Sequence, residues 1–303
     1  MKRILAAGAA FVLLAAASWP QDAPVAVMVK VQGDVSVRAG GGDPAPAAVG
    51  ARLSAGDQVI PSAGGQAVVV HRTGRTEVVT EALTIEAPAA SESGDMFSKT
   101  MQVFAQAANS EARRTGNRQG MIRPLPGGPA PISPRNGILV RTTTPTLTWF
   151  SVEGATGYRV QVRTEGAPLV RFEAGADTVF TIPNESALER GKTYRWTVAP
   201  LQGRPVGEQT FAVLGEDDAG QLDAAFAAIR EMGLDPKDDG RLFAAIAYTD
   251  VGLLYDAADA LRALETDGGV SADVYMLKGE VLDALGRLDE ARAAFDKADE
   301  MLR

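Results

Sequence analysis

Residue types that could carry catalysis are sparse in this chain. Its 303 residues include one histidine, His71, and no cysteine. A serine nucleophile needs a base, and a metal or acid–base site at His71 needs further ligands, which no second histidine supplies. The sequence contains no Gly-x-Ser-x-Gly elbow, no Gly-x4-Gly-Lys-Ser/Thr phosphate loop and no dinucleotide-binding glycine pattern. We therefore expect a structural His71, with a functional role as the alternative, and no cofactor.

Carboxylates are the remaining candidates for chemistry. Asp235, Asp238 and Asp239 precede Gly240, which is similar to part of a calcium-binding loop. The spacing fails, and Ile246 stands where the bidentate glutamate belongs. A hydrolase that acts through two carboxylates stays open as an alternative, although no cleft-forming domain is evident. We expect no metal, no catalytic residue and a function that depends on binding surfaces.

The N-terminus predicts export. Lys2 and Arg3 precede an apolar run over 4–14 and small residues at 15–18, the layout of a secretory signal peptide over residues 1–18. The apolar run is shorter than the ~20 residues that span a bilayer. Cleavage near Ala17 or Ala23 is therefore favoured over a retained anchor. A chain without cysteine and with an alanine-rich signal suits a bacterial envelope, so we expect a periplasmic or cell-envelope location.

Charge is unevenly distributed along the chain. The formal net charge of −8 argues against non-specific binding to nucleic acid. Residues 98–142 hold seven bases and one acid, whereas residues 215–303 hold 21 acids and nine bases. The acidic segment is expected to take a basic or apolar peptide.

A 34-residue period marks the C-terminal segment. Six pairs of positions match at this shift: Ala245 and Gly279, Tyr248 and Leu282, Gly252 and Gly286, Ala257 and Ala291, Leu261 and Phe295, Leu264 and Ala298. Small residues fit where paired helices cross, bulky ones fill the space beside them, and the glycines end the first helix of each pair. A further amphipathic helix over 221–232 brings the expected number of helices over 218–303 to five. A generic alanine-rich bundle is the alternative.

The matched positions resemble the tetratricopeptide repeat family, a protein-binding scaffold that typically holds an extended peptide in a concave groove. The resemblance implies six groove positions: Leu242, Ile246, Thr249, Met276, Glu280 and Asp283. The alternative is that these side chains only solvate or stack the helices.

The span 131–214 predicts a small β-sandwich. Apolar residues alternate at Leu147 and Trp149, and again over 158–162, which predicts two half-buried antiparallel strands joined by a turn at 154–157. Further strands are expected over 179–183, 193–199 and 208–214. Tyr194 has the spacing of a tyrosine corner, and both Trp149 and Trp196 are expected in the core, with a sugar-binding platform as the alternative. This span resembles a fibronectin type III-like domain.

The span 23–90 predicts an all-β domain of eight or nine short strands with glycine-rich corners. It resembles the periplasmic β domain of the FecR family at Gly33-Asp34-Val35, Leu53, Gly56-Asp57, Gly64-Gly65 and Thr73-Gly74. In that family a membrane helix and a cytoplasmic tail control a sigma factor. This chain shows neither, so only the envelope-side β module is implied.

A connector over 95–130 separates the two β domains. Residues 95–114 predict a helix whose stripe contains Met96, Phe97, Met101, Phe104 and Ala108. Such a stripe indicates a face packed on a neighbouring domain, or alternatively a partner site. A basic linker rich in proline and glycine follows.

These observations predict a multidomain protein in which two all-β domains precede an all-α helical array. We expect a non-enzymatic envelope adaptor or scaffold that binds envelope proteins or peptides through its repeats and β modules. The alternative is a glycan-binding protein that uses its β domains on peptidoglycan.

Overall fold

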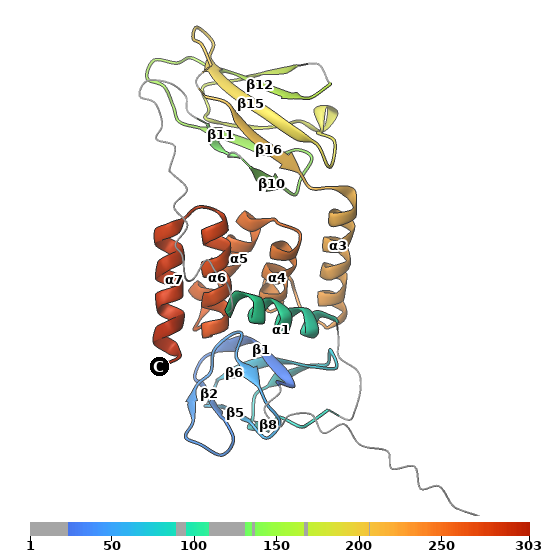
Figure 1. Cartoon of the computed structure of the whole chain (residues 1–303), viewed down its shortest axis with the longest axis vertical. Coiled ribbons are helices and arrows are strands. Elements are labelled where there is room, and N and C mark those ends of the chain that lie inside the picture. Colours follow the sequence, from blue (N-terminus) through green and yellow to red (C-terminus); the bar gives the residue numbers. More distant parts are fainter. Residues whose placement is uncertain (1–23, 89–94, 109–130, 135–136, 167–168, 206) are drawn as a thin grey trace, which may run out of the picture.

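The structure is a computed structural model that describes residues 24–88, 95–108, 131–134, 137–166, 169–205 and 207–303. Three layers follow one another along the long axis of the molecule (Figure 1): a β domain, a row of helices and a β-sandwich. The predicted order of β domains followed by a helical array is confirmed. The expected signal peptide and most of the basic linker lie outside the described residues. Within the described residues no helix is long and apolar enough to cross a membrane.

The first β domain consists of two four-stranded antiparallel sheets. One has the order β4 (Arg52–Leu53), β1 (Ala26–Gln32), β6 (Gln66–His71), β7 (Thr76–Val79). The other has the order β3 (Ala45–Pro46), β2 (Val35–Arg38), β5 (Gln58–Pro61), β8 (Leu83–Thr84). Eight or nine strands were expected and eight are present, and residues 72–75 form the hairpin turn between β6 and β7.

The central strands of the first sheet are buried on both faces. On β1, Ala26 and Met28 face the interior of the domain, while Val27 and Val29 join a core shared with the helices. β6 divides in the same way, with Val68 and Val70 on the helix side. Strands covered on both faces have nearly continuous apolar sequences, which explains the valine runs.

β1 also contains a bulge. Met28 pairs with Val69 and Lys30 pairs with Val68, so Val29 is an extra residue in the ladder. The bulge places Val29 and Lys30 on the same side of the sheet, toward the helices.

The sandwich contains a five-stranded and a three-stranded sheet. The larger has the order β10 (Ile138–Val140), β16 (Gln209–Val213), β15 (Thr193–Pro200), β12 (Tyr158–Thr164), β13 (Val170–Ala174). The smaller has the order β14 (Val179–Thr181), β11 (Thr146–Trp149), β9 (Pro131–Ser133). All neighbours are antiparallel except β10 and β16.

The pairing of the strands around Trp149 and Tyr158 was predicted wrongly. β11 and β12 lie in opposite sheets and face each other across the core, with their two aromatic rings in an edge contact at 5.4 Å. The chain crosses between the sheets over 150–157, where the Val152 N–H donates to the Tyr158 hydroxyl at 2.8 Å. Alternation alone cannot distinguish a hairpin from such a crossing, because both present one apolar face.

The aromatic core of the sandwich is as expected. Trp149 and Trp196 are buried, so neither forms an exposed sugar platform. The Glu189 N–H donates to the Tyr194 hydroxyl at 2.7 Å, which is the hydrogen bond expected of a tyrosine corner. Burial raises the pKa of Tyr194, partly offset by this hydrogen bond.

The C-terminal segment contains the five expected helices. They are α3 (Glu216–Glu231), α4 (Arg241–Asp250), α5 (Leu254–Asp267), α6 (Ala272–Ala284) and α7 (Leu288–Met301). Gly252 and Gly286 follow the first helix of each hairpin with φ of +77° and +72°. This left-handed conformation explains why glycine recurs there. The connector helix α1 (Asp95–Ala108) follows the predicted helix as far as this described segment extends, and residues 109–114 of that prediction lie outside the described residues.

A backbone bridge joins the β domain to the repeats. The Val49 N–H donates to the Gly269 carbonyl at 2.9 Å, and the Ser271 N–H donates to the Val49 carbonyl at 2.8 Å. At the next residue, Gly50, a Cβ atom would lie 2.4 Å from Val274 Cγ2 and 2.7 Å from the Oγ of Ser271, the N-cap residue of α6. Glycine at position 50 therefore permits the contact between the two layers.

We expect Gly50→Ala to lower the free energy of unfolding by about 1–3 kcal/mol more than Gly56→Ala, because overpacking adds to backbone strain. Gly50 and Gly56 both have positive φ, +85° and +92°, but a Cβ at Gly56 would meet no atom within 4 Å. Equilibrium unfolding in denaturant measures the difference. Equal losses in the two variants would contradict a tight contact at Gly50.

Candidate binding site on the helical repeats

Within each hairpin, the two helices pack through side chains of matched size. Gly279 on α6 faces Phe295 on α7, and a Cβ at Gly279 would lie 2.4 Å from Phe295 Cε1. The equivalent residues of the first hairpin are Ala245 and Leu261, both fully buried. The larger Phe295 is thus paired with glycine at position 279, and the smaller Leu261 with alanine at position 245. Ala257 and Ala291 are also buried, as expected for helix crossings.

The six predicted groove positions fall into two groups. Leu242, Ile246 and Met276 are buried in the core that the repeats share with the β domain and α1. Thr249, Glu280 and Asp283 are half-buried, and the Thr249 hydroxyl donates to the Ala245 carbonyl at 2.8 Å. The apolar half of the predicted groove is therefore covered in this structure, and the polar half lies at its margin.

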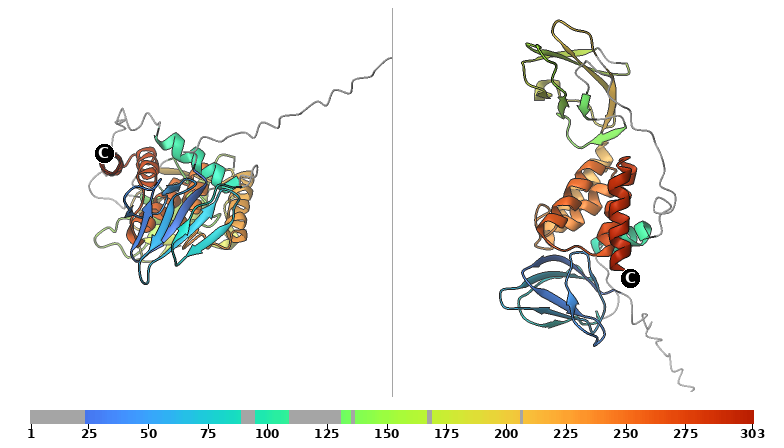
Figure 2. Two further views of the ribbon diagram at one scale, coloured as in Figure 1. Left: turned by 90° about the horizontal axis from the view of Figure 1, so that it is seen from below. Right: turned by 90° about the vertical axis from the view of Figure 1, so that its left-hand side faces the viewer.

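The connector helix α1 provides part of this cover. It crosses α4 and α6, the first helices of the two hairpins, on one side of the row (Figures 1 and 2). Its buried residues are Met96, Phe97, Thr100, Phe104 and Ala107. Ala108, which was expected in the stripe, is exposed. The last turn of α1 buries Ala107 in its place. The Thr100 hydroxyl donates to the Met96 carbonyl at 2.8 Å, which satisfies this buried polar group.

Ion pairs surround the junction between the β domain, α1 and the repeats. Lys30 pairs with Asp238 at 2.7 Å, Arg52 pairs with Asp273 at 2.8 Å, and Lys99 of α1 pairs with Asp250 at the end of α4. Burial raises the pKa of Asp273, and the Arg52 guanidinium opposes this shift. The basic partners come from the β domain and α1, and the acidic partners come from the repeats.

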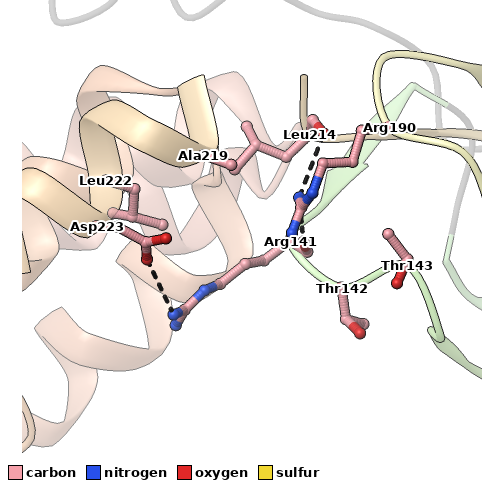
Figure 3. A pocket seen from close by; sticks show the side chains of 8 residues that line it. All are labelled: Arg141, Thr142, Thr143, Arg190, Leu214, Ala219, Leu222 and Asp223. Atoms are coloured by element: carbon pink, nitrogen blue, oxygen red, sulfur yellow. Dashed lines mark hydrogen bonds and ion pairs between the residues drawn. The ribbon is translucent and has the colours of Figure 1, made fainter. Parts of the chain in front are cut away.

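Arg141 marks the joint between the sandwich and the repeats. Its guanidinium lies over the Phe226 ring at 5.2 Å and 4.0 Å from Asp223. Together with Thr142, Thr143 and Arg190 it lines a cleft of about 430 Å³ against α3 (Figure 3). The Arg190 guanidinium donates to the Arg141 carbonyl at 3.2 Å, so both arginines contribute contacts where the sandwich meets the repeats.

Two half-buried groups of the repeats lie close to Arg141. Burial raises the pKa of Tyr248 and of Asp256, and the Arg141 guanidinium opposes both shifts. Tyr248 also forms an edge contact with Phe226 at 5.4 Å. Arg141 thus connects the sandwich to α3, α4 and α5 through charge as well as packing.

The residues considered for chemistry have structural partners. His71 Nε2 lies 3.0 Å from Glu77 Oε2 on the neighbouring strand. In the loop before α4, the Asp235 N–H donates to Asp239 Oδ1 at 2.7 Å, and Asp238 pairs with Lys30. Among the described residues no group of three or more histidines or carboxylates is arranged to hold a metal ion.

Sequence reasoning missed Gly50, Lys99 and Arg141 as contact residues. Lys99 and Arg141 were counted only as members of a basic segment facing an acidic one. That opposition of charge was the available signal, and the structure shows two of its pairs, Lys99 with Asp250 and Arg141 with Asp223. Gly50 carried no signal beyond being a glycine in a β domain.

We expect Gly279→Ala to destabilise the second hairpin by about 1–3 kcal/mol, because the added methyl group meets the Phe295 ring. Phe295→Leu in the same chain should recover most of this loss, since the pair then matches Ala245 and Leu261. A double-mutant cycle of unfolding free energies measures the coupling. Additive effects would contradict the size-matched contact.

We expect Arg52→Ala to lower the free energy of unfolding by about 1 kcal/mol at pH 7, where Asp273 is ionised, because the half-exposed Arg52 is screened by water. The raised pKa means that Asp273 takes up a proton in the folded state more readily than in the unfolded state. The loss should therefore shrink as the pH falls through the pKa of Asp273, which lies above its ordinary value of 3.8. Unfolding free energies measured against pH, with Arg52→Lys as the charge-retaining control, test this. A loss that does not change with pH would contradict it.

Comparison with known proteins identifies no family. No family model matches the chain, and no curated protein matches it. Among solved structures, a redesigned β-sandwich protein is 18% identical over 32% of this chain and 99% of its own, with a TM-score of 0.23. The FN1-FN3 domains of chicken CNTN1 are 9% identical over 63% of this chain and 54% of their own, at 0.21. A β-1,2-glucanase from Parabacteroides distasonis is 15% identical over 58% and 34%, at 0.23. At these TM-scores the likenesses carry no argument about fold or activity.

Proposed function

We propose that this chain is a non-catalytic adaptor of the bacterial cell envelope. In this proposal it is exported to the periplasm and binds envelope proteins or peptides through its helical repeats. The repeats are tetratricopeptide-like, the sandwich is fibronectin type III-like and the first domain is FecR-like. The two β domains hold the repeats in place and offer further contact surfaces.

The observation that carries the proposal is the acidic margin left beside α1. Thr249 and Asp283 occupy equivalent positions at the ends of α4 and α6, with Asp250 next to Thr249. The last carbonyl groups of both helices add partial negative charge at these ends. A basic segment is the partner that fits this margin.

The chain itself supplies an example of such binding. Lys99 reaches Asp250 from α1, a separate segment packed across the same helices. Asp283 forms no ion pair with another described residue. A lysine or arginine of a partner could form an ion pair with Asp283, as Lys99 does with Asp250.

Site-specific photo-crosslinking in producing cells tests the proposal. A photo-reactive residue at Thr249 or Asp283 should crosslink one protein partner, and one at Arg292, on the exposed face of α7, should not. Asp283→Lys should weaken binding of the crosslinked partner about tenfold, the loss of roughly 1.4 kcal/mol. Asp289→Lys, an exposed charge reversal at the start of α7, is the matched control.

Binding to glycan in place of protein is the outcome that would contradict the adaptor. Binding to purified peptidoglycan that is unchanged by Asp283→Lys, without a protein crosslink at Thr249 or Asp283, would contradict the adaptor. Point variants are needed here, because removing the repeats would expose the outer face of β1 and β6.

A further inference from the structure

In the part of the chain that the structure describes, no strand pairs with the outer edge of β13, the last strand of the five-stranded sheet. β13 pairs with β12 on one side, in a regular register over five residue pairs without a bulge. It lies at the end of the sheet opposite β10, and β10 is the strand nearest the repeats (Figure 1). Natural edge strands are usually protected by a proline, a lysine, a bulge or a covering segment, because their backbone groups can pair with another strand. β13 contains no proline, lysine or bulge.

Apolar side chains are exposed along this edge. Leu169 is 40% exposed and Val170 41%, and Val179 on the neighbouring edge strand β14 is 52% exposed. These are three of the seven large apolar side chains exposed among the described residues. The rings of Phe172 and Phe180 lie 5.0 Å apart and join the edges of the two sheets. This side of the sandwich therefore presents a strand edge with exposed apolar side chains beside the charges of Arg171 and Glu173.

The sequence of β13, Val-Arg-Phe-Glu-Ala, is complementary to itself when reversed. Val170, Phe172 and Ala174 pair with inward-facing residues of β12, and Arg171 and Glu173 pair with residues of its outer face. In an antiparallel pair of two copies centred on Phe172, Arg171 would lie opposite Glu173 of the second copy, and Val170 opposite Ala174. Opposite charges across an antiparallel pair are stabilising, and both apolar positions stay on the inner face.

We infer that two copies of this chain associate through β13 in that register, which forms one continuous sheet across a two-fold axis. The inference concerns a surface separate from the repeats and does not depend on the proposed function. A register centred on Arg171 or on Glu173 would place like charges opposite each other. A shift that pairs Arg171 with Phe172 would put apolar residues on the wrong face. The charges therefore select one arrangement, which uses the same surface on both copies.

Charge reversal tests the register directly. Arg171→Glu leaves four acidic side chains at the paired strands and Glu173→Arg leaves four arginines, so each variant alone should dimerise at least about tenfold more weakly than the original. The chain carrying both changes restores both opposite-charge pairs and should dimerise like the original. An equimolar mixture of the two single variants should form a heterodimer for the same reason.

Sedimentation velocity over a concentration series of the full chain provides the measurement. Arg171 and Glu173 are exposed, so circular dichroism should show the fold retained in all variants, with a slightly lower melting temperature where Glu173→Arg faces Arg159 across the β12–β13 pair. Arg204→Glu, an exposed reversal in the loop between β15 and β16, should leave dimerisation unchanged. A chain that stays monomeric at its highest soluble concentration would overturn the inference. So would a dimer insensitive to the single reversals, or single variants that fail to associate when mixed.

Discussion

The structure depends on one apolar core that crosses the boundary between the first β domain and the repeats. The outer faces of β1 and β6, the buried face of α1 and the first helices of both hairpins all contribute to it. Neither layer could expose its share of this surface to water without a large loss of burial free energy. The β domain, α1 and the repeats therefore form a single folding unit, although they are three separate modules in the sequence.

This shared core determines where binding can occur. The apolar positions expected to hold a peptide are used internally, and their place is taken by contacts with the chain's own segments. The part of the predicted groove that remains half-exposed is polar and consists of Thr249, Glu280 and Asp283. The sandwich joins this unit through Arg141, Arg190 and the short connection into α3, and its apolar edge lies away from the joint.

Local sequence patterns predicted most of the helices and strands but little of how these elements pack against one another. The 34-residue period located the helix ends at Gly252 and Gly286, because a left-handed residue is needed there. Alternation located β11 and β12 but not their placement in opposite sheets, because a strand pattern specifies a face and not a neighbour. The covering of Leu242, Ile246 and Met276 could not be predicted, since it depends on contacts between segments more than a hundred residues apart in the sequence.

The bulge in β1 shows how the first sheet accommodates a lysine among valines. In an unbroken ladder, side chains alternate strictly, so with Val29 toward the helices Lys30 would point the other way, into the interior between the two sheets. The extra residue at Val29 shifts the phase by one position, so that valine and lysine both face the helices and the ammonium group reaches Asp238. A single irregular residue thus keeps an ionised group out of the hydrocarbon interior and turns it into a contact between layers.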